Sequence, residues 1–268
     1  MAEVVARGIR FHVQRLAPRH RPLRLQQPVV FIHGLGMDNL SSLYYTLGNP
    51  LAYTGADVIL YDLRGHGFSE RPRNGYRVND SVADLAALLT TLGVNGPVHL
   101  VGNSYGGTVA LSFAMAYPEQ VTSMMLIEAH VPLPGWGEKM ANTITDIGSL
   151  RTQEEWERWI AESRKNANFV TAGTDLTKRT TFIADLQATN PVREQDLRGL
   201  IQPVRAVYGQ QSDVIHHARL LDSLLPQYTL TVLPDVDHWL LTKTPDVVRT
   251  IVLDWFTAEP MTTLAAAG

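Results

Sequence analysis

The sequence contains no cysteine among its 268 residues. Disulfide bonds, a thiol nucleophile and cysteine-ligated metal sites are therefore excluded. No apolar run approaches the roughly 20 residues that a membrane-spanning helix needs, and residues 1–8 lack the apolar core of a signal peptide. Basic residues are not in excess, because the formal net charge is −3, and this balance favours neither a nucleic-acid nor a membrane partner. We therefore expect a cytoplasmic protein.

Short apolar runs alternate with segments of helical periodicity through most of the chain. The runs that predict buried strands cover residues 28–32, 57–62, 98–102, 121–128, 203–209 and 228–233. Residues 8–16 alternate more loosely and predict an edge strand. Strands that alternate with helices at this rhythm imply right-handed crossovers and a mostly parallel sheet covered on both faces. The predicted fold class is therefore α/β.

The alternation stops between residues 131 and 200. Pro132, Pro134 and Gly135 mark the boundary, and no strand-like run follows before residue 201. Residues 152–155 form a capping-box pattern that predicts the start of a helix, and residues 175–189 predict a second one. We expect residues 1–130 and 201–268 to form the sheet domain and residues 131–200 to form a helical cap inserted into it.

The sequence Gly102-Asn103-Ser104-Tyr105-Gly106 stands between a predicted strand and a predicted helix. A serine on a very sharp strand-to-helix turn adopts a strained backbone conformation that exposes its hydroxyl group. The flanking glycines remove the Cβ atoms that would collide where strand and helix approach each other. The pattern therefore predicts that Ser104 is a nucleophile.

A serine hydroxyl needs a base to take its proton and an acid to orient that base. Reactive groups in an open parallel sheet collect at the carboxyl ends of the strands. His238 follows the last predicted strand and is the best candidate base, whereas Asp213 follows the preceding strand and is the best candidate acid. The chain order Ser104, Asp213, His238 is the order that this type of fold uses.

The motifs around these residues resemble those of α/β-hydrolase-fold serine hydrolases with a cap. They comprise residues 33–36 (His-Gly-Leu-Gly), residues 62–69 (Asp-Leu-Arg-Gly-His-Gly-Phe-Ser), the turn at Ser104, Asp213 and His238. The resemblance implies an oxyanion hole made by the backbone N–H groups of Leu35 and Tyr105. It also implies a small-molecule acyl substrate, with no metal and no organic cofactor.

The sequence departs from the family pattern at the acid. The family usually places the acid three residues after the glycine that ends its strand, but Asp213 lies four residues after Gly209. Some relatives take the acid instead from the end of the strand that follows the nucleophile helix, where this chain has Glu128. Asp213 is the preferred prediction and Glu128 is the alternative.

Four further side chains are candidates to line the substrate pocket, namely His130, Trp136, Trp159 and Trp239. His130 stands where the sheet meets the predicted cap. For the tryptophans of the predicted cap, the preferred interpretation is that they pack its helices together, and lining of the pocket is the alternative. His33 precedes the glycine of the oxyanion loop, and we expect it to brace that loop by hydrogen bonding.

Three functions are compatible with the sequence. The first is hydrolysis of a carboxylic ester or thioester through an acyl-serine intermediate. The second is hydrolysis of a carbon–carbon bond, because residues 102–107 and the pair His238-Trp239 resemble ring-cleavage-product hydrolases. The third is a non-hydrolytic role, such as a small-molecule receptor, since some receptors of this fold keep the same catalytic residues.

Overall fold

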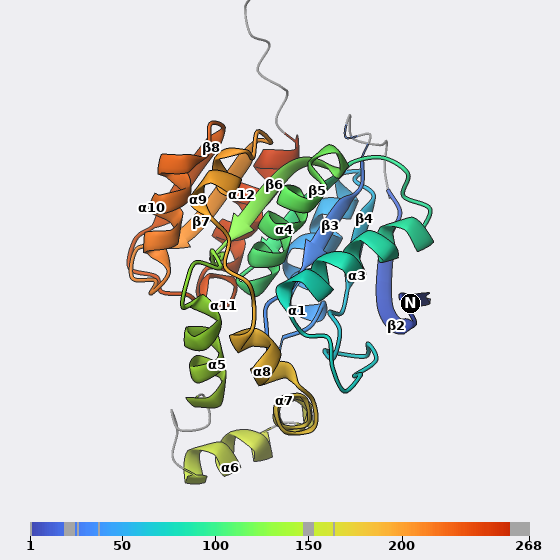
Figure 1. The fold of residues 1–268 in the computed structure, drawn as a ribbon, viewed down its shortest axis with the longest axis vertical. Coiled ribbons are helices and arrows are strands. Elements are labelled where there is room, and N and C mark those ends of the chain that lie inside the picture. Colours follow the sequence, from blue (N-terminus) through green and yellow to red (C-terminus); the bar gives the residue numbers. More distant parts are fainter. Residues whose placement is uncertain are drawn as a thin grey trace, which may run out of the picture.

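A central sheet runs through the protein and carries helices on both faces (Figure 1). The computed structural model describes residues 2–18, 25, 27–36, 38–146, 153–162 and 164–257. Its strands are β1 (Ala2–Ala6), β2 (Ile9–Leu16), β3 (Val29–Ile32), β4 (Val58–Tyr61), β5 (Val98–Asn103), β6 (Val121–Ile127), β7 (Val204–Gly209) and β8 (Tyr228–Leu233). Its helices are α1 (Ser41–Leu43), η1 (Tyr44–Gly48), α2 (Asn49–Tyr53), α3 (Val78–Thr91), α4 (Tyr105–Ala116), η2 (Pro118–Gln120), α5 (Trp136–Asp146), α6 (Gln153–Glu162), α7 (Arg164–Arg179), α8 (Phe182–Gln187), α9 (Glu194–Arg198), α10 (Ile215–Leu224), α11 (Leu240–Lys243) and α12 (Pro245–Thr257). Among the described helices, none combines the length and the apolarity needed to cross a bilayer.

The described strands pair in the order β1-β2-β4-β3-β5-β6-β7-β8. Strand β2 is antiparallel to both β1 and β4, and all the other pairs are parallel. The prediction that residues 8–16 form an edge strand is wrong, because residues 2–6 pair along their outer side. The mostly parallel α/β sheet expected from the alternation of strands and helices is confirmed.

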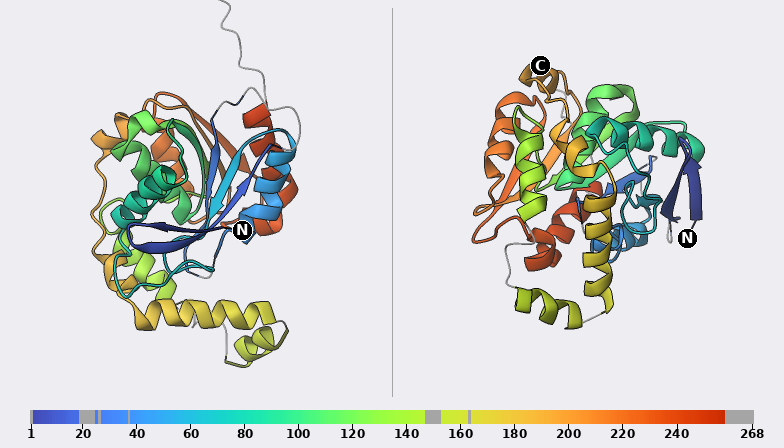
Figure 2. Two further views of the ribbon diagram at one scale, coloured as in Figure 1. Left: turned by 90° about the vertical axis from the view of Figure 1, so that its right-hand side faces the viewer. Right: turned by 60° about the horizontal axis from the view of Figure 1, so that its bottom comes forward.

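Strand β3 shows why the predicted strands are continuously apolar. All four of its residues are buried. Val30 and Ile32 pack into the apolar layer that contains residues of α3 and α4, whereas Val29 and Phe31 pack into the layer that contains residues of α2 and α12. The left view of Figure 2 shows these two layers of helices on opposite faces of the sheet. A strand covered on both faces has no position where a polar side chain reaches water.

The described residues between β6 and β7 form helices α5 to α9 and no strand. Figure 1 shows α5, α7 and α8 together at the end of the sheet toward which β6 runs. Phe182 of α8 packs edge-on against Tyr76, with ring centroids 5.8 Å apart. That this segment acts as a cap over a binding site stays a prediction.

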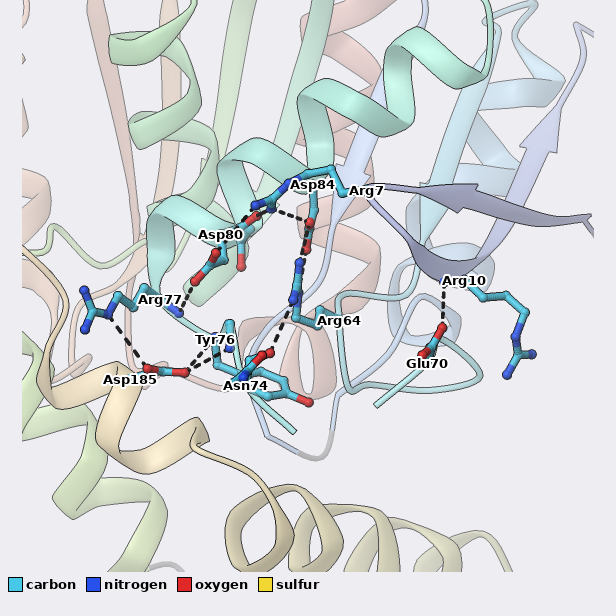
Figure 3. A network of polar contacts seen from close by, with 12 residues as sticks. Arg7, Arg10, Arg64, Glu70, Asn74, Tyr76, Arg77, Asp80, Asp84 and Asp185 are labelled. Carbon is cyan, nitrogen blue, oxygen red and sulfur yellow. Dashed lines mark hydrogen bonds and ion pairs between the residues drawn. The ribbon is translucent and has the colours of Figure 1, made fainter. Parts of the chain in front are cut away.

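Asp185 ties α8 to the loop before α3 (Figure 3). Its carboxylate accepts hydrogen bonds from the backbone N–H groups of Gly75 and Tyr76, at 3.2 and 3.0 Å. The backbone N–H of Thr181 donates to the carbonyl oxygen of Arg73 at 2.8 Å. The helical segment is therefore anchored to the sheet domain by polar contacts as well as by ring packing.

A buried ion pair joins the turn after β4 to α3 (Figure 3). The guanidinium group of Arg64 donates two hydrogen bonds to Asp84, at 2.8 and 2.6 Å. The side chains are only 9% and 2% exposed, so water can replace neither partner. Arg7, which lies between β1 and β2, adds a third hydrogen bond to Asp84 at 2.7 Å. The ion pair therefore holds the turn after β4 against α3.

We expect Asp84→Ala to lower the free energy of unfolding by about 3–5 kcal/mol, because it leaves a buried guanidinium group without its carboxylate. Chemical denaturation monitored by circular dichroism measures this change. The matched control is Asp246→Ala, which removes a carboxylate that is 82% exposed and paired with Arg249. That control should lose no more than about 1 kcal/mol. Equal losses in the two variants would contradict the expected effect of burial.

Candidate active site

Ser104 occupies the sharp turn between β5 and α4. Its backbone angles are φ 53° and ψ −115°, a conformation that few residues other than glycine adopt. A Cβ atom on Gly102 would collide with the backbone of Gly106, and one on Gly106 would collide with the backbone of Ile32. Glycine is therefore required at both positions, as the sequence predicts, because strand and helix approach each other closely there. The turn leaves Ser104 partly exposed.

A chain of hydrogen bonds runs from Ser104 through His238 to Glu128. The Nε2 atom of His238 lies 3.1 Å from the hydroxyl oxygen of Ser104. The Nδ1 atom of the same ring lies 2.9 Å from the Oε2 atom of Glu128. A carboxylate only accepts hydrogen bonds, so Nδ1 carries the proton of the neutral ring and Nε2 is free to accept one from the serine. This is the arrangement that a general base needs.

The carboxylate of Glu128 is fully buried at the carboxyl end of β6. Its Oε1 atom accepts the backbone N–H of Gly209 at 2.5 Å, and its Oε2 atom accepts the hydroxyl group of Ser212. Both partners belong to the end of β7 and the loop that follows it. Glu128 itself has a φ of 52°, which turns the chain sharply after the strand. These contacts hold the carboxylate in place at Nδ1 of the imidazole ring.

Asp213, the preferred acid of the sequence prediction, does not reach the histidine. Its Oδ1 atom lies 4.0 Å from Nδ1 of His238, beyond hydrogen-bond distance, and its side chain is 67% exposed. Ser212, three residues after Gly209, occupies the position from which the family usually supplies the acid, and it donates to Glu128 instead. The geometry therefore corrects the preference for Asp213 in favour of the alternative, Glu128. The contact between Ser212 and Glu128 was not predicted from the sequence. The signal that could have indicated it is that Ser212, and not Asp213, lies three residues after Gly209.

Leu35 and Tyr105 flank the nucleophile on two sides. Tyr105 is the first residue of α4, where the backbone N–H groups of a helix lack intrahelical partners. Leu35 lies in the loop of residues 33–36 after β3. A Cβ atom built on Gly34 would stand 3.7 Å from the Cβ atom of Ser104, so this loop lies directly against the nucleophile. The positions fit the predicted oxyanion hole, and the role of the two amides stays a prediction.

Two of the four predicted pocket residues lie in a buried aromatic group beside His238. The ring of His130 lies 5.4 Å from that of His238 and 6.5 Å from that of Trp136. Trp136 in turn stacks on Tyr105, with ring centroids 6.3 Å apart. Trp239 is 64% exposed, and its ring lies edge-on to that of His238 with the centroids 6.4 Å apart. The side chain of Trp159 lies outside the described residues.

The environment of His130 keeps its imidazole ring uncharged. Burial lowers the pKa of His130 well below its usual value, and the neighbouring rings of His238 and His217 lower it further. A neutral ring next to Trp136 adds hydrogen-bonding capacity to the aromatic group without adding charge.

Known proteins share this architecture. The family model described as alpha/beta hydrolase fold matches residues 27–146, which include β3, the Ser104 turn and β6. An esterase from Exiguobacterium antarcticum superposes on 96% of this chain and on 99% of its own, with a TM-score of 0.74 and 17% identity. The chain has the α/β-hydrolase fold.

Proteins similar in sequence to this chain carry the names of different substrates. The 2-(acetamidomethylene)succinate hydrolase of Mesorhizobium japonicum is 24% identical over 251 residues, which cover 86% of this chain and 88% of that protein. The 2-hydroxy-6-oxo-2,4-heptadienoate hydrolase of Pseudomonas putida is 37% identical over 103 residues, which cover 38% of this chain and 37% of that protein. Both of these names state hydrolysis, and they name different substrates.

The chain also has a pair of adjacent histidines at the start of α10. The rings of His216 and His217 lie 4.2 Å apart, and His217 lies 5.9 Å from His130. Within the part of the chain that the structure describes, no group of three or more histidine, aspartate or glutamate residues has an arrangement that could hold a metal ion. The absence of a metal or an organic cofactor stays a prediction from the family resemblance.

Proposed function

We propose that the enzyme hydrolyses a carboxylic ester or thioester through an acyl-serine intermediate. The observation that carries the proposal is the continuous hydrogen-bond chain from Ser104 through His238 to Glu128. In this proposal Ser104 is the nucleophile, His238 is the general base and acid, and Glu128 is the carboxylate that orients the ring.

The geometry supports the following sequence of steps. The Ser104 oxygen attacks the acyl carbon while its proton passes to Nε2 of His238, and the backbone N–H groups of Leu35 and Tyr105 donate hydrogen bonds to the negatively charged former carbonyl oxygen. The imidazolium then gives its proton to the leaving oxygen or sulfur atom. Water, deprotonated by the same ring, attacks the acyl-serine and releases the acid. Throughout, Glu128 holds the proton on Nδ1 and stabilises the positive ring.

The aromatic group formed by His130, Trp136 and Tyr105 supports an uncharged acyl group as substrate. These rings pack against one another beside His238, and His130 is neutral for the reason given above. We propose a small-molecule substrate whose acyl part packs against Trp136, with the 131–200 segment as the cap that encloses it. In this proposal the exposed Trp239, whose ring lies beside that of His238, contacts the leaving group.

A second candidate reaction is the hydrolysis of a carbon–carbon bond. The observation that favours it is the 37% identity to the 2-hydroxy-6-oxo-2,4-heptadienoate hydrolase over 103 residues. The same serine and histidine would serve, but the proton would go to a carbon atom of the leaving group. The two reactions are therefore distinguished by comparing the rates at which the protein hydrolyses an ester, a thioester and a carbon–carbon substrate.

We expect p-nitrophenyl esters or acyl thioesters of graded chain length to be turned over faster than a ring-fission dienol. We also expect a fluorophosphonate probe to add a single adduct, which peptide mass spectrometry places on Ser104. Preference for the dienol would establish carbon–carbon hydrolysis instead. A burst of acylation without turnover would favour the non-hydrolytic role, and a probe that leaves Ser104 unlabelled would refute the proposal.

A further inference from the structure

Two buried histidines hold the oxyanion loop of residues 33–36 in place. His33 accepts the backbone N–H of Leu63 at Nε2, at 2.9 Å, and its Nδ1 atom lies 2.7 Å from the carbonyl oxygen of Gly34. His66 accepts the backbone N–H of Gly36 at Nε2, at 3.0 Å. Its Nδ1 atom lies 2.8 Å from the carbonyl oxygen of Arg64. An amide N–H only donates and a carbonyl oxygen only accepts, so both rings carry their proton on Nδ1.

His33 and His66 hold the loop on the two sides of the proposed oxyanion donor: His33 contacts the carbonyl oxygen of Gly34, in the peptide unit that contains the Leu35 N–H, and His66 binds the N–H of the next peptide unit. Gly36 follows Leu35 directly, and its φ of 81° makes the chain turn at this point. The hydrogen bond to His66 fixes the plane of the peptide unit that joins Leu35 to Gly36. The position of Leu35 is therefore fixed as well. Displacement of Gly36 would therefore move the Leu35 amide relative to Ser104.

We infer that His66 is a positioning residue of the oxyanion hole, which it completes by binding the Gly36 amide through Nε2. The inference rests on the proposed function, because it presupposes that the Leu35 amide stabilises a tetrahedral intermediate. The two ring nitrogens of His66 contact Gly36 and Arg64 and not Ser104, His238 or Glu128. His66 acts through the position of Leu35.

The surroundings of His66 keep it suited to this role. Burial, followed by the neighbouring His33 ring, lowers the pKa of His66 to about 3, so Nε2 keeps its lone pair. Phe182 of α8 packs edge-on against the His66 ring at 6.2 Å. Ile144 of α5 lies 3.4 Å from the place where a Cβ atom on Gly36 would stand. The 131–200 segment thus packs against both partners of the Gly36 hydrogen bond.

A matched pair of substitutions tests the acceptor alone. In His66→Asn the amide group can replace Nδ1 as the donor to Arg64, but it cannot reach Gly36. In His66→Gln the side-chain oxygen can take the place of Nε2 and accept the Gly36 N–H. The control for loss of a buried histidine is His99→Asn. His99 lies near the start of β5, contacts Ser123 at 2.7 Å and is far along the strand from Ser104.

We expect His66→Asn to lower kcat for an ester roughly 10- to 100-fold with KM changed less than about twofold, because a displaced donor loses part of the 100- to 1,000-fold contribution of an oxyanion amide. His66→Gln should stay within about threefold of the native enzyme. The affinity for a boronic acid that forms a tetrahedral adduct with Ser104 should fall in parallel with kcat/KM. The control should keep kcat even where its Tm falls.

The outcomes separate this inference from the proposed function. If the native enzyme neither hydrolyses esters nor reacts with the fluorophosphonate probe at Ser104, the proposed function fails. If the native enzyme does both and His66→Asn keeps its kcat, the inference about His66 is overturned. Equal losses of kcat in His66→Asn and His66→Gln would also overturn it. The effect would then come from loss of the imidazole ring and not from loss of the acceptor for the Gly36 N–H.

Discussion

The Ser104→Ala variant is expected to lose ester hydrolysis by roughly five to six orders of magnitude in kcat, with the fold unchanged. Alanine removes the oxygen that lies 3.1 Å from Nε2 of His238 and leaves the backbone turn as it is. No other hydroxyl group is recorded within hydrogen-bond distance of His238 among the described residues. Steady-state turnover of a p-nitrophenyl ester, with the protein concentration raised to reveal residual activity, measures the loss.

The matched control for this prediction is Ser212→Ala. Ser212 is also a serine in the site, but its hydroxyl group contacts Glu128 and not the reacting atoms. Its removal should lower kcat far less than the loss of Ser104. The Tm of the Ser104 variant should match that of the native protein, since the hydroxyl group of Ser104 is only partly buried. Retention of more than about one-hundredth of the native kcat in Ser104→Ala would exclude an acyl-serine intermediate.

Most of the fold could be predicted because its strands are buried on both faces. Residues 29–32 and residues 124–127 are continuously apolar for this reason, and such runs are visible without any structure. Strand β1 was not predicted, because an edge strand with exposed residues such as Glu3 and Val5 has little apolar periodicity. The helix expected over 175–189 is instead the end of α7 followed by α8, separated by a break at residues 180–181.

The site could be predicted where the backbone itself demands particular residues. The turn at Ser104 requires glycines at 102 and 106, so its sequence pattern is specific. The acid could not be chosen in the same way. A carboxylate can reach His238 from the end of β6 or from the loop after β7, and the choice depends on how far each loop extends. Glu128 is buried and Asp213 faces solvent, a difference that is a property of the packed structure and not of either residue.

Glu128→Gln is expected to lower kcat about ten-thousand-fold, the loss seen when the carboxylate of a catalytic triad is replaced by its amide. Glutamine fills the same volume and can still accept the Gly209 N–H at its oxygen, so the fold should persist. Its amide nitrogen would then face Nδ1 of His238 as a donor. The ring would have to carry its proton on Nε2, where it could no longer accept one from Ser104. Steady-state kinetics beside a thermal unfolding curve distinguish this loss from misfolding.

Asp213→Asn is the matched control for this substitution, because it makes the same chemical change on an exposed side chain 4.0 Å from Nδ1. Its kcat should stay within about twofold of the native value, since a screened and solvated carboxylate contributes little to the orientation of the ring. A further variant places a new acid at the position that the family usually uses: Ser212→Asp combined with Glu128→Ala should recover part of the activity lost by Glu128→Ala alone, because residue 212 already contacts the oxygen that binds His238. A silent Glu128→Gln together with an inactive Asp213→Asn would instead assign the acid to Asp213, and the loop after β7 would then have to move inward in solution.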